Sequence, residues 1–326
     1  MAFDRFGRKI HYLRISLTDH CNLRCIYCMP EEMSFRPTAE MMQDDEVLLF
    51  ARLFAGLGFE KVRLTGGEPT MRAHIVDIVR GITNTPGIKS VSMTTNGVLL
   101  SKLAKPLAEA GLERVNVSID TLNPAKFNRL TRGGDIEKVW QGILAAEKAG
   151  LNPIKLNAVV VRGYNEDDIV DLAGLTRDHS WRMRFIEMMP FDGATDFQVG
   201  QMVSAVEMQA RIEEALGPLM PENEGDLDGE ARIFRLPGAQ GDIGFIASVS
   251  APFCSECTRA RLTPDGILKM CLLREYEVDL LTPLRSGASL EDLRKLVLET
   301  IWNKPWGHGL ANMEIPMNRV MSEIGG

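Results

Sequence analysis

Alternating apolar and polar residues mark short segments at regular intervals along the first 190 residues. Such alternation indicates β-strands, because successive side chains of a strand point to opposite faces. The predicted strands cover residues 11–17, 60–65, 89–94, 113–119, 153–161 and 182–188. Apolar residues with helical spacing lie between them, near residues 44–57, 72–84, 101–110, 135–149 and 166–178. Repeated strand–helix units predict an α/β fold with a parallel sheet and helices outside it.

In five of the predicted strands one face is apolar and the other is polar, whereas the segment 182–188 gives no clean alternation. The polar face carries Arg14, Ser16, Thr18, Arg63, Thr65, Ser92, Thr94, Asn116, Ser118, Asp120, Lys155 and Asn157. Helices cover the apolar face, so the polar face must line an interior. The pattern predicts an incomplete (β/α)6 barrel of the TIM type with a polar ligand inside. An open doubly wound sheet is the alternative.

The pattern changes after about residue 200. A predicted helix near 204–216 is followed by a stretch rich in glycine, proline and acidic residues, and then by short strands near 231–249. A second group of cysteines and a helix near 289–300 come after them. We expect the barrel to cover residues 1–220. We expect residues 221–326 to form a smaller segment that packs against the open side of the barrel.

Charge and hydropathy exclude some classes of partner. The chain has 37 Lys and Arg against 44 Asp and Glu, a net charge of −7. Nucleic-acid binding relies on many basic contacts, so no nucleic-acid partner is expected, although a few local cations could hold a small anion. No apolar stretch approaches the ~20 residues of a membrane span. We therefore expect a cytoplasmic protein without a membrane partner.

The six cysteines fall into two triplets, Cys21, Cys25, Cys28 and Cys254, Cys257, Cys271. Random placement would produce the first spacing, CxxxCxxC, about 0.002 times in this chain. Disulfides are disfavoured in a reducing compartment, and triplets do not divide into pairs. Three thiolates can bind three irons of a [4Fe–4S] cluster and leave the fourth iron open to a ligand. A structural zinc site is the alternative, but it needs a fourth ligand.

CxxxCxxC directly after a first strand, followed by TGGEP at residues 65–69, resembles the radical S-adenosylmethionine (SAM) enzymes. The resemblance implies that Cys21, Cys25 and Cys28 bind a [4Fe–4S] cluster. It also implies that Tyr27, Gly67, Ser118 and Met189 contact SAM. Enzymes of this kind cleave SAM reductively to a 5′-deoxyadenosyl radical. In them the cofactor carries the difficult chemistry, and the protein positions the substrate.

The second triplet, spaced Cys-x₂-Cys-x₁₃-Cys, precedes a chain end of sequence SEIGG. Together with RVNVSID, RFIEMMP and CTRAR, these features resemble the GTP 3′,8-cyclase family of molybdenum cofactor biosynthesis. The resemblance implies that a second [4Fe–4S] cluster on Cys254, Cys257 and Cys271 holds the purine. It implies a GTP site of Arg14, Arg63, Thr94, Lys155, Arg259, Ala260 and Arg261. Arg14, Arg259 and Arg261 would also be catalytic, and the terminal diglycine would reach into the active site.

The reaction implied by the resemblance converts GTP to (8S)-3′,8-cyclo-7,8-dihydroguanosine 5′-triphosphate. The 5′-deoxyadenosyl radical would take the C3′ hydrogen of GTP, and the ribose radical would add to C8 of guanine. An external one-electron reductant would be needed, and the product would pass to cyclic pyranopterin monophosphate synthase. The chain could act as a monomer or homodimer. The alternatives are a radical SAM peptide maturase with an auxiliary cluster and a non-catalytic metal-binding scaffold.

Overall fold

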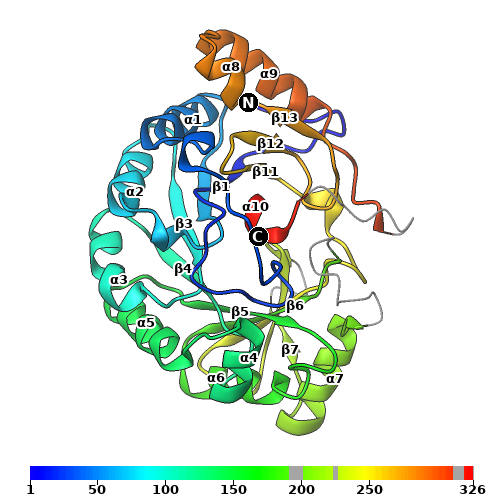
Figure 1. Ribbon diagram of the computed structural model, residues 1–326. Coiled ribbons are helices and arrows are strands. Elements are labelled where there is room, and N and C mark those ends of the chain that lie inside the picture. The colour runs from blue at the N-terminus through cyan, green and yellow to red at the C-terminus, as the bar shows by residue number, and fades with distance from the viewer. Residues whose placement is uncertain (191–200, 223–226, 311–318, 326) are drawn as a thin grey trace.

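The computed structural model describes residues 1–190, 201–222, 227–310 and 319–325. All six predicted strands of the first half are present and lie parallel to one another. They are β1 Tyr12–Ser16, β2 Lys61–Thr65, β3 Ser90–Thr95, β4 Arg114–Ser118, β5 Lys155–Val160 and β6 Arg182–Glu187. They curve around a central space and follow one another in chain order (Figure 1). The architecture is therefore the incomplete barrel and not the open doubly wound sheet.

Helices cover the outside of this curved sheet (Figure 1). They are α1 Asp44–Gly56, α2 Ile75–Thr83, α3 Leu100–Glu109, α4 Pro124–Thr131, α5 Ile136–Lys148, α6 Ile169–Asp178 and α7 Ala205–Leu216. Five of the first six were predicted, as was α7. The helical spacing of apolar residues did not reveal α4, which has only eight residues. The sequence marks this helix mainly by the capping residue at its N-terminus. There, Asn123 accepts a hydrogen bond from the Lys126 N–H at 3.0 Å, and Pro124 occupies the first turn.

We expected the C-terminal segment to pack against the open side of the barrel. The structure shows that it also extends the sheet of the barrel at both edges. Strand β11 (Arg259–Leu262) pairs parallel with β1, and β10 (Asp242–Ile246) pairs parallel with β6. Antiparallel strands continue from each: β12 Ile267–Lys269 and β13 Glu277–Asp279 on one side, β9 Ala231–Arg235 and β7 Met220–Pro221 on the other, with β8 Leu227–Asp228 paired to β9. In the described residues, these strands form one 13-stranded sheet.

The core lies between the sheet and its helices. The outward-facing side chains of β1 to β5 are buried there, as the alternation predicts. Met183 and Phe185 of β6 are buried in the same core, while Arg184 and Ile186 face the interior. Strand β6 therefore alternates like the others. The sequence obscured this because Arg182 and Arg184 stand beside apolar Ile186 on the inner face.

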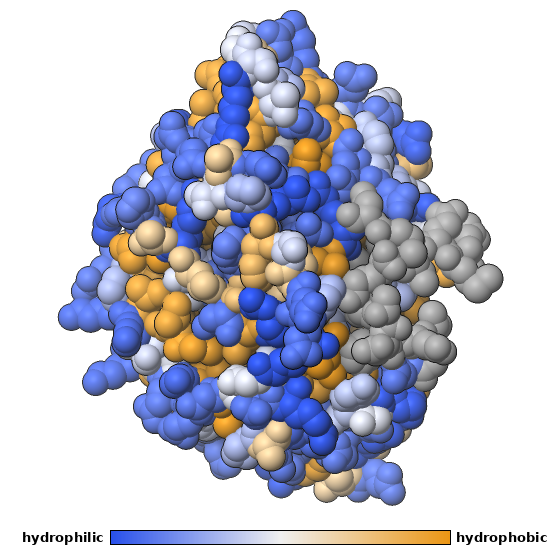
Figure 2. All heavy atoms as spheres, in the orientation of Figure 1, coloured by the Kyte–Doolittle hydropathy of each residue, from blue (hydrophilic) through white to orange (hydrophobic). Residues whose placement is uncertain are grey.

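Three further helices and several 3₁₀ turns complete the described structure. Helices α8 (Leu281–Arg285) and α9 (Leu290–Trp302) lie beside β13 at the top of Figure 1. Helix α10 (Met321–Ile324) lies in the middle of the barrel, next to the C-terminus. Short 3₁₀ turns cover Thr38–Glu40, Pro69–Met71 and Cys254–Glu256. Hydrophilic and hydrophobic residues are interspersed over the face in Figure 2. Within the described residues, no helix has the length and apolarity needed to cross a lipid bilayer.

Candidate active site

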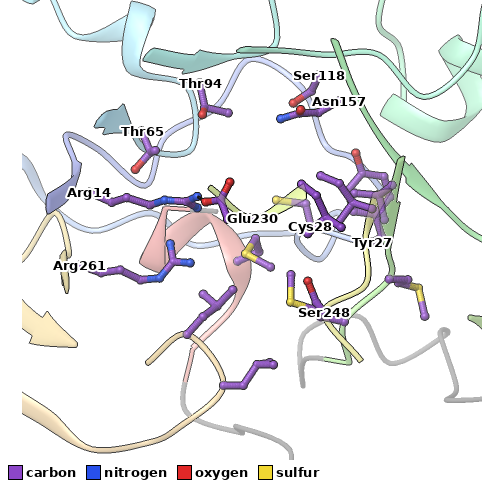
Figure 3. Close-up of a pocket in the computed structure, with 18 of the residues that line it drawn as sticks. Arg14, Tyr27, Cys28, Thr65, Thr94, Ser118, Asn157, Glu230, Ser248 and Arg261 are labelled. Atoms are coloured by element: carbon purple, nitrogen blue, oxygen red, sulfur yellow. Dashed lines mark hydrogen bonds and ion pairs between the residues drawn. The ribbon is translucent and has the colours of Figure 1, made fainter. Parts of the chain in front are cut away.

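A cavity of about 300 Å³ lies inside the barrel, on the polar face of the strands. Thr65, Thr94, Ser118 and Asn157 line it from four successive strands, as the alternation predicts (Figure 3). All six cysteines line the same cavity: Cys21, Cys25, Cys28, Cys254, Cys257 and Cys271. None of them forms a disulfide. The fold thus brings together two triplets that stand more than 220 residues apart in the sequence.

The first triplet lies on the loop that follows β1. Helix α4 holds this loop, because the backbone N–H groups of Arg24 and Ile26 donate to the carbonyl oxygens that end the helix, each at 3.0 Å. The Leu23 N–H and the Asn96 amide both donate to the Cys21 sulfur, at 3.4 and 3.7 Å. Burial raises the pKa of the Cys21 thiol to about 11. These thiols therefore keep their protons unless a cation such as iron binds them.

The glycines of TGGEP allow two loops to touch. A Cβ on Gly67 would lie 2.4 Å from the backbone oxygens of Asp19 and His20, closer than any side chain tolerates. The Gly67 N–H donates to the Thr18 oxygen at 2.6 Å. This contact fixes the glycine turn against the loop that leads into Cys21, so that both line one wall of the cavity.

Tyr27 and Asp120 also line the cavity, and a hydrogen bond joins them. The Tyr27 hydroxyl donates to Asp120 Oδ2 at 2.6 Å, and the Val159 N–H donates to Asp120 Oδ1 at 2.9 Å. Burial raises the pKa of the Asp120 carboxyl to about 6. The tyrosine between Cys25 and Cys28 is thereby tied to the end of β4, near Ser118.

In the second triplet, Cys254 and Cys257 lie between β10 and β11 and Cys271 follows β12, and positive charges lie beside them. The Arg8 guanidinium donates to the Cys254 backbone oxygen at 2.6 Å. The Lys304 ammonium is buried and donates to the backbone oxygens of Arg259, at 2.8 Å, and Met270. Burial by itself would raise the pKa of the Cys257 thiol, but the charges of Lys304 and Arg259 lower it to about 6. A thiolate, the form that binds iron, is thus already favoured at this position.

Arginines from both halves of the chain converge in the cavity. The register between β1 and β11 places Arg14 beside Arg261, and both guanidiniums point inward (Figure 3). The lining residues Arg63, Arg184 and Arg259 add three further charges. The carboxylate of Glu230, which precedes β9, lies among them and is paired with Arg14, Arg184 and Arg259. Such a cluster can bind a polyanion.

A second cavity of about 160 Å³ adjoins the first. It is lined by Lys61, Arg114 and Lys155, and it shares Arg63, Arg184, Glu230 and Arg259 with the first cavity. Cys257 lines both cavities and the other five cysteines line only the first, while the second adds the cations of Lys61, Arg114 and Lys155. An elongated ligand with an anionic end fits this arrangement.

Comparison with known proteins identifies the family. A model of the radical SAM superfamily matches residues 15–176, and a model described as Molybdenum Cofactor Synthesis C matches residues 181–310. GTP 3′,8-cyclase of Pelotomaculum thermopropionicum is 44% identical over 324 residues, which cover 99% of both chains. The enzyme of the same name from Peptoclostridium acidaminophilum is 45% identical over 328 residues, 100% of this chain and 98% of that one. The chain belongs to the GTP 3′,8-cyclase family.

Two further comparisons concern a mammalian relative and a solved structure. Molybdenum cofactor biosynthesis protein 1 of Mus musculus is 44% identical over 99% of this chain, which spans 51% of the mouse protein. The crystal structure of Streptococcus suis SuiB bound to S-adenosylmethionine superposes with a TM-score of 0.63 at 14% identity, covering 94% of this chain and 68% of SuiB. That likeness shows a shared fold.

The cysteines fit the clusters that membership of the radical SAM cyclase family implies. Each triplet presents three thiols to the cavity, and each of those ligands serves a different iron in a [4Fe–4S] cluster. In the described parts of the chain, no three His, Cys, Asp or Glu side chains converge on one point as a single-ion site requires. The enzyme uses SAM and iron–sulfur clusters as cofactors.

Most residues predicted to bind substrate or cofactor in this cyclase family member line one of the two cavities. Tyr27, Gly67, Ser118, Met189, Arg14, Arg63, Thr94, Arg259 and Arg261 line the first, and Lys155 lines the second. Ala260 differs, because its side chain packs in the apolar core on the other face of β11. Only the Ala260 backbone is available to a ligand. The roles of all these residues stay predictions.

The sequence interpretation missed three charged residues that line the first cavity: Arg184, Glu187 and Glu230. Arg184 stands opposite Asn157 in the pairing of β5 with β6, so strict alternation along β6 would have found it. Glu230 carries no comparable signal, because it belongs to an acidic, glycine-rich stretch that has the composition of a surface loop.

The chain's tail lies inside the barrel, against inward-facing residues of β1 and β2. Arg261 Nη1 donates to the Gly325 backbone oxygen at 2.9 Å. Gly325 has φ +78°, and a Cβ there would lie 2.3 Å from Thr65 Oγ1 and 2.8 Å from the Ser16 Cβ. Both the backbone conformation and the narrow space thus require glycine. Gly326 lies outside the described residues.

Proposed function

We propose that this chain converts GTP to (8S)-3′,8-cyclo-7,8-dihydroguanosine 5′-triphosphate, the first step of molybdenum cofactor biosynthesis. The observation that carries the proposal is the single cavity lined by both cysteine triplets and by arginines of both halves of the chain. A peptide substrate would not need this concentration of positive charge. The GTP 3′,8-cyclases that resemble the chain over its whole length support the same reaction.

The first triplet and its surroundings would hold the cluster and SAM. Cys21, Cys25 and Cys28 are the cluster ligands in this proposal. Tyr27, Gly67, Ser118 and Met189, which surround them, would contact SAM. When bound, these cofactors supply the 5′-deoxyadenosyl radical that abstracts the C3′ hydrogen. The chain's own task is to orient the ribose and to keep water and other hydrogen donors out of the cavity.

The arginines and the second triplet would hold GTP. A triphosphate carries a charge near −4 and needs several cations once it leaves water. The cationic end of the two cavities, with Arg63, Lys155 and Arg184, suits the phosphates. The purine would then lie toward Cys254, Cys257 and Cys271, whose cluster has an iron open to a ligand. Arg14, Arg259 and Arg261 are proposed both to contact GTP and to act in catalysis, with Thr94 and the Ala260 backbone as further substrate contacts.

The wider setting follows from the same proposal. Reductive SAM cleavage needs an external one-electron donor, and the triphosphate product is the substrate expected of cyclic pyranopterin monophosphate synthase. Two clusters on reduced cysteines suit a cytoplasmic enzyme, acting as monomer or homodimer. We propose a division of the chain into the barrel, 1–220, and the cluster-bearing segment, 221–326.

The proposal is tested by incubating the anaerobically reconstituted protein with SAM, a reductant and either GTP or ATP. Mass spectrometry of the nucleotide fraction should show a cyclised product from GTP and much less from ATP. SAM cleavage without any nucleotide product would contradict the proposal. Turnover of a peptide in the same assay would favour the maturase alternative.

A further inference from the structure

The Glu230 carboxylate lies where the two cavities meet, and it lines both. The residue is only 8% exposed. Its Oε1 accepts hydrogen bonds from Arg14 Nη2 and, at 2.7 Å, from Arg259 Nη1. Its Oε2 accepts from Arg184 Nη2 at 2.8 Å. One carboxylate thus bridges arginines of three strands: β1, β6 and β11.

The charges around Glu230 exceed what one carboxylate can balance. Burial opposes its ionisation, but the charges of Arg14, Arg259, Arg184 and Arg63 hold the pKa of the Glu230 carboxyl well below its usual range. Burial and the neighbouring Arg14 and Arg259 charges lower the pKa of Arg261. The Nε atoms of Arg14 and Arg184 are buried without a hydrogen-bond partner. The cluster therefore retains unused donors and excess positive charge, as a site for a larger anion would.

A carboxylate and a phosphate edge present the same feature to a guanidinium, namely two anionic oxygens that accept parallel N–H donors. A ligand phosphate and Glu230 therefore compete for the same arginines. They also repel each other if both stay within the cluster. The carboxylate reaches the cluster from a turn, and Gly229 before it is exposed with φ +72°.

We propose that Glu230 is an internal anion that occupies a phosphate subsite of the empty enzyme and is displaced when a polyphosphate binds. This inference rests on the proposed function in taking the ligand to be a nucleoside triphosphate. The carboxylate keeps the arginines paired while the site is empty. It lowers the affinity for every ligand whose phosphates enter the subsite, and it re-forms its pairs as the triphosphate product leaves.

Equilibrium binding to the protein with both clusters loaded, without SAM or reductant, tests the proposal. The ligands are inorganic tripolyphosphate, GTP, ATP and guanosine, and the variant is Glu230→Gln. The change removes a charged competitor for several charge-assisted hydrogen bonds, so tripolyphosphate and GTP should bind roughly ten- to a hundred-fold more tightly. Guanosine should bind the variant and the wild type equally. Glu222→Gln is the matched control, because Glu222 pairs with Arg235 in the same hairpin and lines neither cavity described here.

Thermal denaturation gives a second measurement. Removing one partner of a buried charge cluster destabilises the fold, so the ligand-free Glu230→Gln variant should have a lower Tm than the wild type. Tripolyphosphate should raise the Tm of the variant by more than it raises the Tm of the wild type. If Glu230→Gln does not fold, Glu230→Asp is the second variant. Its shorter side chain cannot reach all three guanidiniums, so it should still bind tripolyphosphate more tightly than the wild type.

Unchanged or weaker tripolyphosphate binding by the Glu230 variants would overturn the proposal and leave Glu230 as a residue that merely positions the arginines. The outcome is separate from the test of the proposed function. Equal binding of GTP and ATP by the wild type would count against a guanine-specific reaction, whereas the tripolyphosphate result would still decide the role of Glu230.

Discussion

Arg261 donates a hydrogen bond to the backbone oxygen of Gly325, 2.9 Å away, inside the barrel. The arginine belongs to β11, shortly after Cys257, and the glycine to the chain's tail. The side chain that helps to form the cationic cavity therefore also holds the tail in it. A change at either residue should disturb the substrate site without touching the cysteines.

Gly325→Ala is expected to reduce GTP conversion by roughly tenfold or more, because it combines a strained backbone conformation with a collision against Thr65. Iron content and SAM cleavage should stay near the wild-type level. Gly287→Ala is the matched control: Gly287 has φ +87° but open space around its Cβ position. Activity measured alongside iron content checks the expectation. Equal activity of Gly325→Ala and Gly287→Ala would show that the tail's position is unimportant.

The first cysteine triplet is expected to be essential for SAM cleavage. The triple variant Cys21→Ala, Cys25→Ala, Cys28→Ala should lose about half of the iron, because three protein ligands hold one of two clusters. It should form no 5′-deoxyadenosine from SAM under reducing conditions. Iron analysis and chromatography of the SAM products measure both effects. SAM cleavage by this variant would contradict the assignment of the triplet.

The second triplet is expected to serve the substrate. The triple variant Cys254→Ala, Cys257→Ala, Cys271→Ala should keep uncoupled SAM cleavage and about half of the iron, yet fail to convert GTP. The two triplets line one cavity but stand on separate parts of the chain, so the first should survive loss of the second. Wild-type-like GTP conversion by this variant would disprove the division of roles.

The cations of the two cavities are expected to hold the phosphates. Single Ala variants of Arg14, Lys155, Arg184, Arg259 and Arg261 should each bind GTP roughly ten- to a hundred-fold more weakly, because each loses a charge-assisted contact. Uncoupled SAM cleavage should remain. Lys105→Ala, at an exposed lysine of α3, provides the control. GTP affinity that matches the control in all five variants would place the phosphates elsewhere.

The thiols of the cluster-free protein are expected to differ in reactivity. The pKa of Cys257 is lowered to about 6, and that of Cys28 is raised to about 12 by burial and by the nearby Cys21 and Asp120. Because the thiolate is the nucleophile, the rate of Cys257 alkylation should rise as the pH passes 6. It should be close to its maximum by pH 8. Cys28 should stay slow throughout that range.

Lys304 should account for much of this difference. Lys304→Met removes the positive charge near Cys257, raises the pKa of that thiol, and should slow its alkylation at pH 7 roughly tenfold. Lys295→Met, at an exposed lysine of α9, is the control. Peptide mass spectrometry after timed alkylation gives the rates. Equal rates in both variants would mean that Lys304 does not set the pKa of Cys257.

The strands and the polar interior of the barrel could be predicted from the sequence because both follow from a local period of two residues. Arg14, Arg63, Thr94 and Ser118 lie inside because their neighbours are apolar and pack on the helices. Helix α4 was not predicted, because it is too short for a long apolar pattern and is marked only by the side chain that caps its N-terminus. Such short elements give little periodic signal.

The position of Glu230 and the pairing of β10 and β11 with the barrel edges could not be predicted. Both depend on contacts between residues far apart in the chain, such as Arg14 with Glu230 and Leu13 with Ala260. A run of acids and glycines predicts a surface turn, and nothing in it indicates that one carboxylate enters a cluster of arginines. Only the assembled fold shows this.

The central claim is that GTP lies in this cavity with its C3′ hydrogen accessible to the radical derived from SAM. The most direct measurement uses GTP deuterated at C3′, with SAM and a reductant, in the anaerobically reconstituted protein. The claim predicts that deuterium appears in 5′-deoxyadenosine and that a cyclised guanine nucleotide accumulates in equal amount. Cyclised product with 5′-deoxyadenosine free of deuterium, or labelled 5′-deoxyadenosine with no cyclised nucleotide, would contradict it.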